Sequence, residues 1–116
     1  MRIADAVKYV LANRKNKVCK DWTPFQITHS ISMALENRTL AYTTDTHGNL
    51  NGIVWGKPDF EKKVLHIETI LATCKSTLPK LMRHFLDIYD GWTLTADRRG
   101  KFVKYSTERL RKTYGS

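Results

Sequence analysis

The spacing of apolar residues changes twice along this chain, and this change constrains its fold more than any motif does. In two N-terminal segments apolar residues recur at the interval of a helix face, at Ile3, Val7, Val10 and Leu11 and again at Ile27, Ile31, Ala34 and Leu35. Short β-prone runs follow at 39–44, 50–55 and 63–73. A helical interval returns after residue 76, at Leu78, Leu81, Met82, Phe85 and Tyr89. The run 92–96 predicts one more strand, and the segment 101–114 predicts a closing helix.

The second helix has the clearest boundaries. The sequence Thr-Pro-Phe-Gln at 23–26 supplies a capping threonine, a proline for the first turn and a glutamine that completes a capping box. Trp22 and Ile27 have the spacing of a hydrophobic staple across this start. Asn37 suits the end of the helix. These signals predict a helix that begins directly after Thr23.

The predicted elements follow the order α-α-β-β-β-α-β-α in a single domain over residues 1–116, of the α/β (α+β) class. Three consecutive strands with short connections favour an antiparallel meander, and a strand–helix–strand connection favours a parallel, right-handed crossover. The run 63–73 is the longest, and its near-continuous apolar character predicts a central strand covered on both faces. We therefore expect a mixed sheet with helices on both faces.

The positive charge is concentrated in two segments, and it points to an anionic partner. The net charge is +9; segments 14–20 and 98–112 together hold eleven cations and one carboxylate, against nine cations and ten carboxylates elsewhere. Aromatic residues lie in or beside the second segment, as on surfaces that track phosphates and stack on bases. The residues predicted to contact nucleic acid or an acidic protein surface are Arg98, Arg99, Lys101, Lys104, Arg109 and Arg111. A solvated basic helix without a specific partner is the alternative.

Several classes of protein are disfavoured. Cys19 and Cys74 belong to no metal or disulfide motif, and the four histidines have no metal-ligand spacing, so we expect no metal site. No apolar stretch is long enough for a signal peptide or a membrane span, so we expect a cytoplasmic protein without membrane contact. Sequence-specific readout of nucleic acid is not expected, because no helix-turn-helix, RNP or KH signature is present.

From Ala4 to Tyr114 the element order resembles the core of the GNAT acetyltransferase fold. In that family, backbone amides between the central strand and the next helix bind the pyrophosphate of acetyl-CoA. The resemblance implies that this cofactor turn comprises Thr73, Cys74, Lys75, Ser76 and Thr77. A helix N-terminus supplies free N–H groups and partial positive charge. The glycines of the family signature, which let a backbone approach phosphate closely, are absent between Gly56 and Gly91.

The resemblance also implies two catalytic residues. In the family, a glutamate on the central strand can deprotonate the acceptor amine, and Glu68 stands on that strand two residues after His66, on the same face. Pairing of these two side chains with each other or with lysines is the structural alternative. The family's Asn-x-x-Ala-x-x-x-Tyr run opens the last helix and supplies a general acid. Here Arg98 and Lys101 replace its Asn and Ala, and Tyr105 keeps the tyrosine.

Two functions remain open. One is acetyl-CoA-dependent N-acetyl transfer by Glu68 and Tyr105. The other is a GNAT-like scaffold without catalysis, which binds nucleic acid or an acidic protein through its basic surface. The missing glycines, and the absence of sequence for the family's final two strands, favour the second. A short, glycine-poor chain of this kind is similar to GNAT-like proteins of tailed bacteriophages, which implies the host cytoplasm or the virion as its location.

Overall fold

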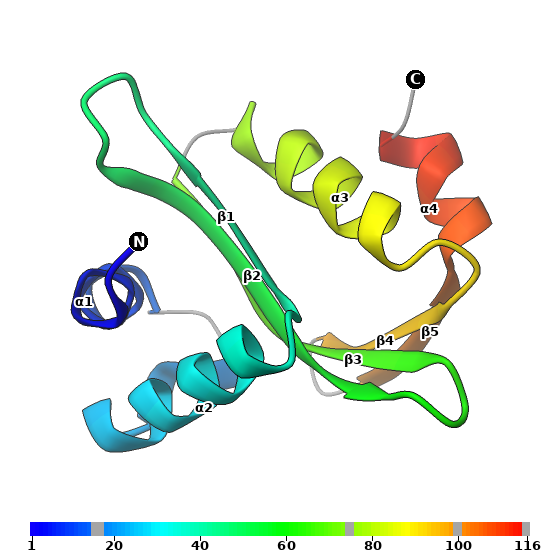
Figure 1. Cartoon of the computed structure of the whole chain (residues 1–116), viewed down its shortest axis with the longest axis horizontal. Coiled ribbons are helices and arrows are strands. Elements are labelled where there is room, and N and C mark those ends of the chain that lie inside the picture. The colour runs from blue at the N-terminus through cyan, green and yellow to red at the C-terminus, as the bar shows by residue number, and fades with distance from the viewer. Residues whose placement is uncertain (15–17, 74–75, 99–100, 115–116) are drawn as a thin grey trace.

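The computed structural model describes residues 1–14, 18–73, 76–98 and 101–114 (Figure 1). Four α-helices, one short 3-10 helix and five strands follow one another in the order α1 (Ile3–Asn13), η1 (Val18–Asp21), α2 (Pro24–Glu36), β1 (Leu40–Thr44), β2 (Leu50–Asp59), β3 (Val64–Ala72), α3 (Thr77–Ile88), β4 (Thr93–Arg98), β5 (Lys101–Ser106) and α4 (Thr107–Tyr114). Within these residues no helix is both long and apolar enough to cross a bilayer.

The five strands form one mixed sheet in the order β1-β2-β3-β4-β5. The first three strands are an antiparallel meander, β3 and β4 run parallel, and β4 and β5 are antiparallel. The predicted meander and the predicted parallel pairing across α3 are therefore confirmed. β3 lies in the middle of the sheet, as predicted, but its burial alternates along the strand, and the strand with continuous burial is β2 instead.

The predicted start of α2 is confirmed in detail. The Thr23 hydroxyl accepts a hydrogen bond from the Gln26 amide at 3.1 Å, and the Gln26 side chain accepts one from the Thr23 amide at 2.8 Å. Ile27 is fully buried, with Trp22 packed against the same cluster. Asn37 caps the other end, and Arg38 follows with φ 58, in the left-handed conformation that usually favours glycine.

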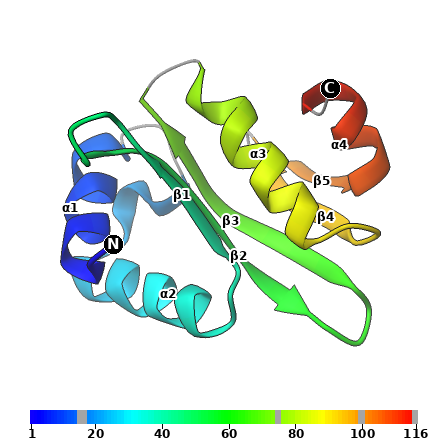
Figure 2. The same cartoon turned by 45° about the horizontal axis from the view of Figure 1, so that its top comes forward.

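Helices cover both faces of the sheet, as predicted (Figures 1 and 2). On one side lies the α1/α2 cluster, which consists of Ala6, Val10, Cys19, Ile27, Ile31, Ala34, Ile53, Trp55 and Leu71. On the other side lies the α3/α4 cluster, which consists of Ala41, Val54, Leu65, Ile67, Leu81, Met82, Phe85, Leu86, Tyr89, Leu94 and Leu110. Alternate residues of β2 enter opposite clusters, so this strand is buried on both faces. Each large side chain buried in this way stabilises the fold by about 1.5–3 kcal/mol.

A β-bulge interrupts β3 at Glu68. Thr69 pairs with Trp55 and Ile67 pairs with Gly56, so Glu68 lies opposite no residue of β2. The pairing of β3 with β4 ends at the same place, since the last matched residues are Ile67 and Ala96. A bulge bends its strand and redirects the side chains that follow it. The bulge therefore marks the point where β3 leaves β4.

The prediction of one continuous helix over 101–114 is wrong. Residues 101–106 form β5, and helix α4 begins only at Thr107. The burial of β5 alternates with a period of two: Val103 and Tyr105 are half-buried, while Lys101, Phe102 and Lys104 are exposed. Pairing with β4 satisfies the backbone of this segment and places Tyr105 against the α3/α4 cluster. Tertiary pairing thus outweighs the helical spacing that Val103, Leu110 and Tyr114 offer in the sequence.

Candidate functional site

Glu68 is held by a short chain of hydrogen bonds that begins in the core. The buried Trp55 donates from Nε1 to the Ser30 hydroxyl at 2.8 Å, and Ser30 donates to Glu68 Oε2 at 2.7 Å. Lys57 Nζ lies 3.6 Å from Glu68 Oε1. The Glu68 side chain is only 10% exposed, so its carboxylate is recessed and fixed in orientation. Because α2 supplies Ser30 and β2 supplies Trp55, the position of Glu68 depends on the packing of α2 on the sheet.

A pocket of about 710 Å³ opens beside Glu68, between α2 and the connection from β2 to β3. Its walls include Trp22, Phe25 and Phe60, with Met33 on α2 between them. Glu68 and Lys57 are the charged residues that line it apart from His29, which can carry a proton. A recessed carboxylate with aromatic walls is an arrangement that can hold an organic ligand.

His66 shares a face of β3 with Glu68, but it has partners of its own. Its Nδ1 lies 2.8 Å from the Thr95 hydroxyl, and its Nε2 lies 3.6 Å from Asp97 Oδ2. The ring stacks on Phe102, with centroids 6.0 Å apart and planes 5° from parallel. Glu68 pairs with Ser30 and Lys57, so the proposed pairing with a lysine is found, while His66 instead joins β3 to β4 and β5.

The two predicted catalytic residues do not lie together. Tyr105 stands on β5 opposite Leu94, and both side chains belong to the α3/α4 side of the sheet. Glu68 contacts α2 on the opposite side. The predicted general acid was also expected on a helix, whereas Tyr105 is a strand residue. A shared proton path between Glu68 and Tyr105 would have to cross the sheet.

The predicted cofactor turn is described at Thr73, Ser76 and Thr77, while Cys74 and Lys75 lie outside the described residues. The Thr73 hydroxyl donates to the Asn51 carbonyl at 3.0 Å, and Thr77 is buried against Gly52. Ser76 precedes α3 without forming a side-chain cap. Pyrophosphate would therefore meet backbone N–H groups at the start of α3 rather than the two threonine hydroxyls, and Pro79 lacks an N–H.

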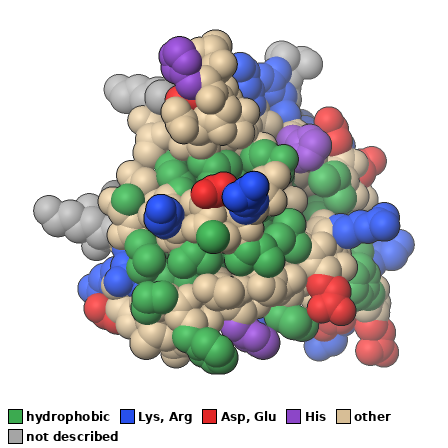
Figure 3. All heavy atoms as spheres, turned by 60° about the vertical axis from the view of Figure 1, so that its left-hand side comes forward, with side chains coloured by type: hydrophobic (Ala, Val, Ile, Leu, Met, Phe, Trp, Pro, Cys, Tyr) green, Lys and Arg blue, Asp and Glu red, His purple; other side chains and the backbone are tan. Residues whose placement is uncertain are grey.

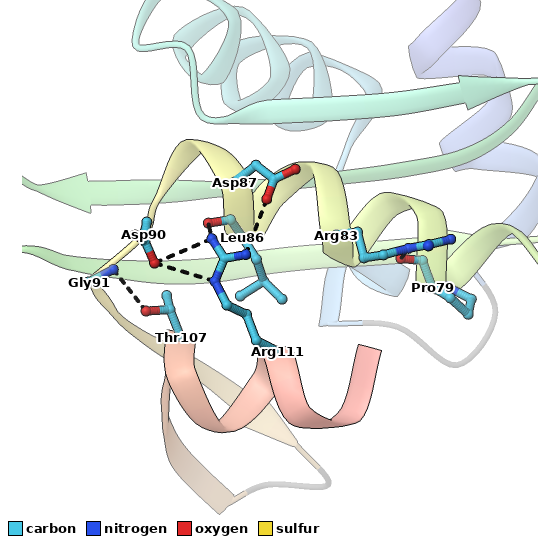
Figure 4. A network of polar contacts seen from close by, with 8 residues as sticks. All are labelled: Pro79, Arg83, Leu86, Asp87, Asp90, Gly91, Thr107 and Arg111. Carbon is cyan, nitrogen blue, oxygen red and sulfur yellow. Dashed lines mark hydrogen bonds and ion pairs between the residues drawn. The ribbon is translucent and has the colours of Figure 1, made fainter. Parts of the chain in front are cut away.

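The predicted anion-binding residues divide into two groups. Lys101, Lys104 and Arg109 are exposed. Arg111 instead forms ion pairs with Asp87 at 3.2 Å and Asp90 at 3.3 Å, and it donates to the Leu86 carbonyl (Figure 4). Arg111 thus fastens α4 to α3. Arg98 ends β4 in register with Lys101, while its side chain and Arg99 lie outside the described residues.

The first basic segment, residues 14–20, is described in part. Arg14, in the first basic segment, donates to the Trp22 carbonyl and closes the connection between α1 and α2. Lys20 is exposed on η1, and Lys15 and Lys17 are not described. No group of three or more His, Cys, Asp or Glu side chains suited to a metal ion occurs among the residues with described positions.

Comparisons with protein-family models, with curated proteins and with solved structures found no match to this chain. Two features of the site were not predicted from the sequence. The stack of Phe102 on His66 could have been suspected from the alternating, β-prone sequence of 101–106. The hydrogen bonds from Trp55 through Ser30 to Glu68 join three segments that are far apart in the sequence, and no local sequence pattern predicts them.

Proposed function

We propose that this protein binds single-stranded nucleic acid on the open side of β3, β4 and β5. The surface concerned, named the hairpin surface below, consists of His66, Phe102 and Lys104, which share one face of the sheet. It lies on the side of the sheet that α1 and α2 cover farther along, and the described α1/α2 cluster has no member from β4 or β5. On this face Asp97, Phe102 and Lys104 are exposed, while Thr95 beneath them is buried.

The observation that carries the proposal is the exposed aromatic ring of Phe102. Its side chain is 59% exposed although it stands on a sheet face, and the parallel His66 ring supports it from one side. An aromatic ring in this position offers its free face to a nucleobase, and such stacking contributes about 1–3 kcal/mol per base. The stack of His66 on Phe102 would hold the ring ready for that contact.

Charge at the β4–β5 turn supports the same proposal. Arg98 ends β4 in register with Lys101, and the sequence places three cations, Arg98, Arg99 and Lys101, within four consecutive positions. Lys104 is exposed on the same face as Phe102. Phosphates could follow this line of cations while bases stack on Phe102. Asp97, beside His66, is the opposing charge on this face.

The test is fluorescence anisotropy with labelled oligothymidylate, using protein freed of nucleic acid, at several salt concentrations between about 50 and 200 mM. We expect Phe102→Ala to weaken binding about tenfold with little change in the salt dependence. The variant Lys104→Glu should weaken binding and flatten the salt dependence. Lys8→Glu, on exposed α1, makes a comparable charge change elsewhere and is the control.

Three results would redirect this proposal. Equal binding by the wild-type protein and by Phe102→Ala would show that Phe102 does not stack on a base. Equal loss in Lys8→Glu and in the hairpin variants would mean that only overall charge matters. Tighter binding to polyglutamate than to the oligonucleotide would favour an acidic protein partner instead.

A second candidate is acetyl-CoA-dependent N-acetyl transfer on a GNAT-like scaffold, and the recessed Glu68 favours it. The meander and the parallel crossover support the resemblance to that family. Glu68, oriented by Ser30, could accept a proton from an amine in the adjoining pocket. Calorimetric titration with acetyl-CoA tests the candidate, together with turnover of small amines by wild type and Glu68→Gln. No heat at millimolar cofactor would exclude it.

A further inference from the structure

The exposed side of α2 differs in character from the rest of this basic protein. Residues 21–37 contain no lysine or arginine and only two carboxylates, Asp21 and Glu36, although the chain has twenty cations. Three large apolar residues of α2 are exposed, Phe25 at 80%, Met33 at 43% and Leu35 at 38%. Protein interfaces are depleted of charge and enriched in aromatic and methionine side chains. The composition of α2 is therefore that of an interface.

The apolar side chains of this surface lie around one groove. The pocket of about 710 Å³ beside Glu68 is lined by Phe25 and Met33 from α2 and by Phe60, which is 62% exposed, from the connection after β2. Trp22 and Pro58 add further apolar wall. Figure 3 views the side that carries α1 and α2, and hydrophobic side chains gather across it, around two Lys or Arg side chains and one Asp or Glu side chain near its middle. A protruding ring and a groove thus occur on the same patch.

We propose that this patch binds a second copy of the same chain and forms a symmetric dimer. In a two-fold interface each patch meets its own copy, so both chains bring the same net charge to the contact. A chain with net charge +9 repels its own copy, and this patch keeps the repulsion low, because α2 has no cation and Lys57 in the groove lies 3.6 Å from the Glu68 carboxylate. The protruding Phe25 and the groove beside it give such a patch the shape needed to complement its own copy.

The symmetry fixes which residues would meet. A two-fold axis across the middle of α2, near His29, makes the two α2 helices antiparallel. Phe25 of each copy then lies beside the Met33 end of the other α2. There it can enter the partner's groove, between Met33 and Phe60. A standard interface buries about 800 Å² per partner, which is near a tenth of the 7805 Å² surface of this chain.

The test is sedimentation-velocity ultracentrifugation of nucleic-acid-free protein over a wide range of concentration. We expect a monomer–dimer equilibrium, and Phe25→Glu and Met33→Glu should each raise the dimer dissociation constant at least about tenfold. Phe25 is exposed in the first turn of α2, where a carboxylate suits the helix dipole, so its replacement should not disturb folding. The matched control is Ile88→Glu, which puts the same charge at a 49% exposed apolar position on α3.

Salt provides a second, independent readout. Raising the ionic strength screens the repulsion between two basic chains, so it should strengthen the dimer or leave it unchanged. A monomer at every concentration would overturn the proposal. So would a dimer that persists in both α2 variants, one that Ile88→Glu weakens equally, or one that salt dissociates. Circular dichroism of each variant confirms that the comparison is made between folded proteins.

Discussion

The two ends of the sheet are built differently, although one strand order runs through both. At the β1–β3 end, residues of β2 enter the α1/α2 cluster and the α3/α4 cluster in turn, so helices press on both faces. At the β4–β5 end, Leu94 is buried against α3 and α4 while Phe102 on the opposite face is 59% exposed. One sheet is thus buried on both faces at the β1–β3 end and exposed on one face at the β4–β5 end.

Substitutions at the two ends of the sheet should therefore differ in their effect on the free energy of unfolding. At the β1–β3 end substitutions should be poorly tolerated, because helices pack on both faces of the sheet and leave little space around each side chain. The singly covered end can present an aromatic ring and cations to a ligand without weakening the core. The following substitutions test that contrast, and they are ordered from the largest expected effect on the free energy of unfolding to the smallest.

Gly56→Ala should destabilise the protein most, by about 3 kcal/mol or more. A Cβ at position 56 would overlap the backbone carbonyl of His66, beside the bulge at Glu68, and backbone atoms cannot move aside cheaply. The matched control is Gly52→Ala on the same strand. Its Cβ would meet three side chains, Thr77 Cγ2 at 2.5 Å, Leu81 Cδ1 at 2.7 Å and Thr43 Oγ1 at 2.8 Å, and side chains yield more easily than backbone. Urea denaturation measures both, and a smaller loss in Gly56→Ala than in Gly52→Ala would contradict the argument.

Ser30→Ala should destabilise the protein by about 1–3 kcal/mol. The change leaves the buried Nε1–H of Trp55 without its acceptor and removes the donor to Glu68 Oε2. Ser32→Ala, two residues farther along α2, removes a hydroxyl outside this chain of hydrogen bonds and serves as the control. Denaturation of the two variants tests the idea, which fails if their stabilities are equal.

Tyr89→Phe should cost about 1 kcal/mol at neutral pH. The Tyr89 hydroxyl donates to the Arg38 carbonyl at 2.8 Å, which ties α3 to the segment between α2 and β1. Burial raises the pKa of the Tyr89 phenol above its ordinary value. The folded state therefore keeps a proton that the unfolded state loses, so wild-type stability should fall as the pH rises above about 10. Melting curves across this range should show a shallower fall in Tyr89→Phe.

Phe102→Ala should change the stability by no more than about 0.5 kcal/mol, because the ring is largely exposed. Leu94→Ala, on the buried face of the same hairpin, should by contrast cost about 2–5 kcal/mol. Thermal unfolding of the two variants compares the faces directly. A large loss in Phe102→Ala would mean that the hairpin surface is part of the core and not a surface reserved for a ligand.

The sequence was a good guide where local signals and burial agree. The cap formed by Thr23 and Gln26 is written in four consecutive residues, and the structure contains both of its hydrogen bonds. The central position of β3 follows from apolar residues that face both ways. At 101–114 the helical spacing was misleading, because the pairing with β4 that decides the conformation of 101–106 is not visible in the segment itself.

The candidate sites show the same division. That His66 and Glu68 share a face follows from strand geometry alone. The bulge at Glu68 depends on how β2 and β3 align, and the partners Ser30 and Trp55 come from distant segments. The role of Arg111 was predicted as anion binding, but it is already paired with Asp87 and Asp90 of α3. Charge can be counted from a sequence, but the partner of a charge cannot.

The short ladder between β3 and β4 has a consequence for how the molecule opens. Only four residue pairs, from Val64–Thr93 to Ile67–Ala96, join the hairpin to the rest of the sheet. Other attachments are the contacts of His66 with Thr95, Asp97 and Phe102, the packing of Leu94 in the α3/α4 cluster and the ion pairs of Arg111. We therefore expect the amide hydrogens of β4 and β5 to exchange together through a local opening, and those of β2 and β3 to exchange only through global unfolding. The boundary between β3 and β4, beside the bulge, would then separate two parts of the domain that open to hydrogen exchange at different rates.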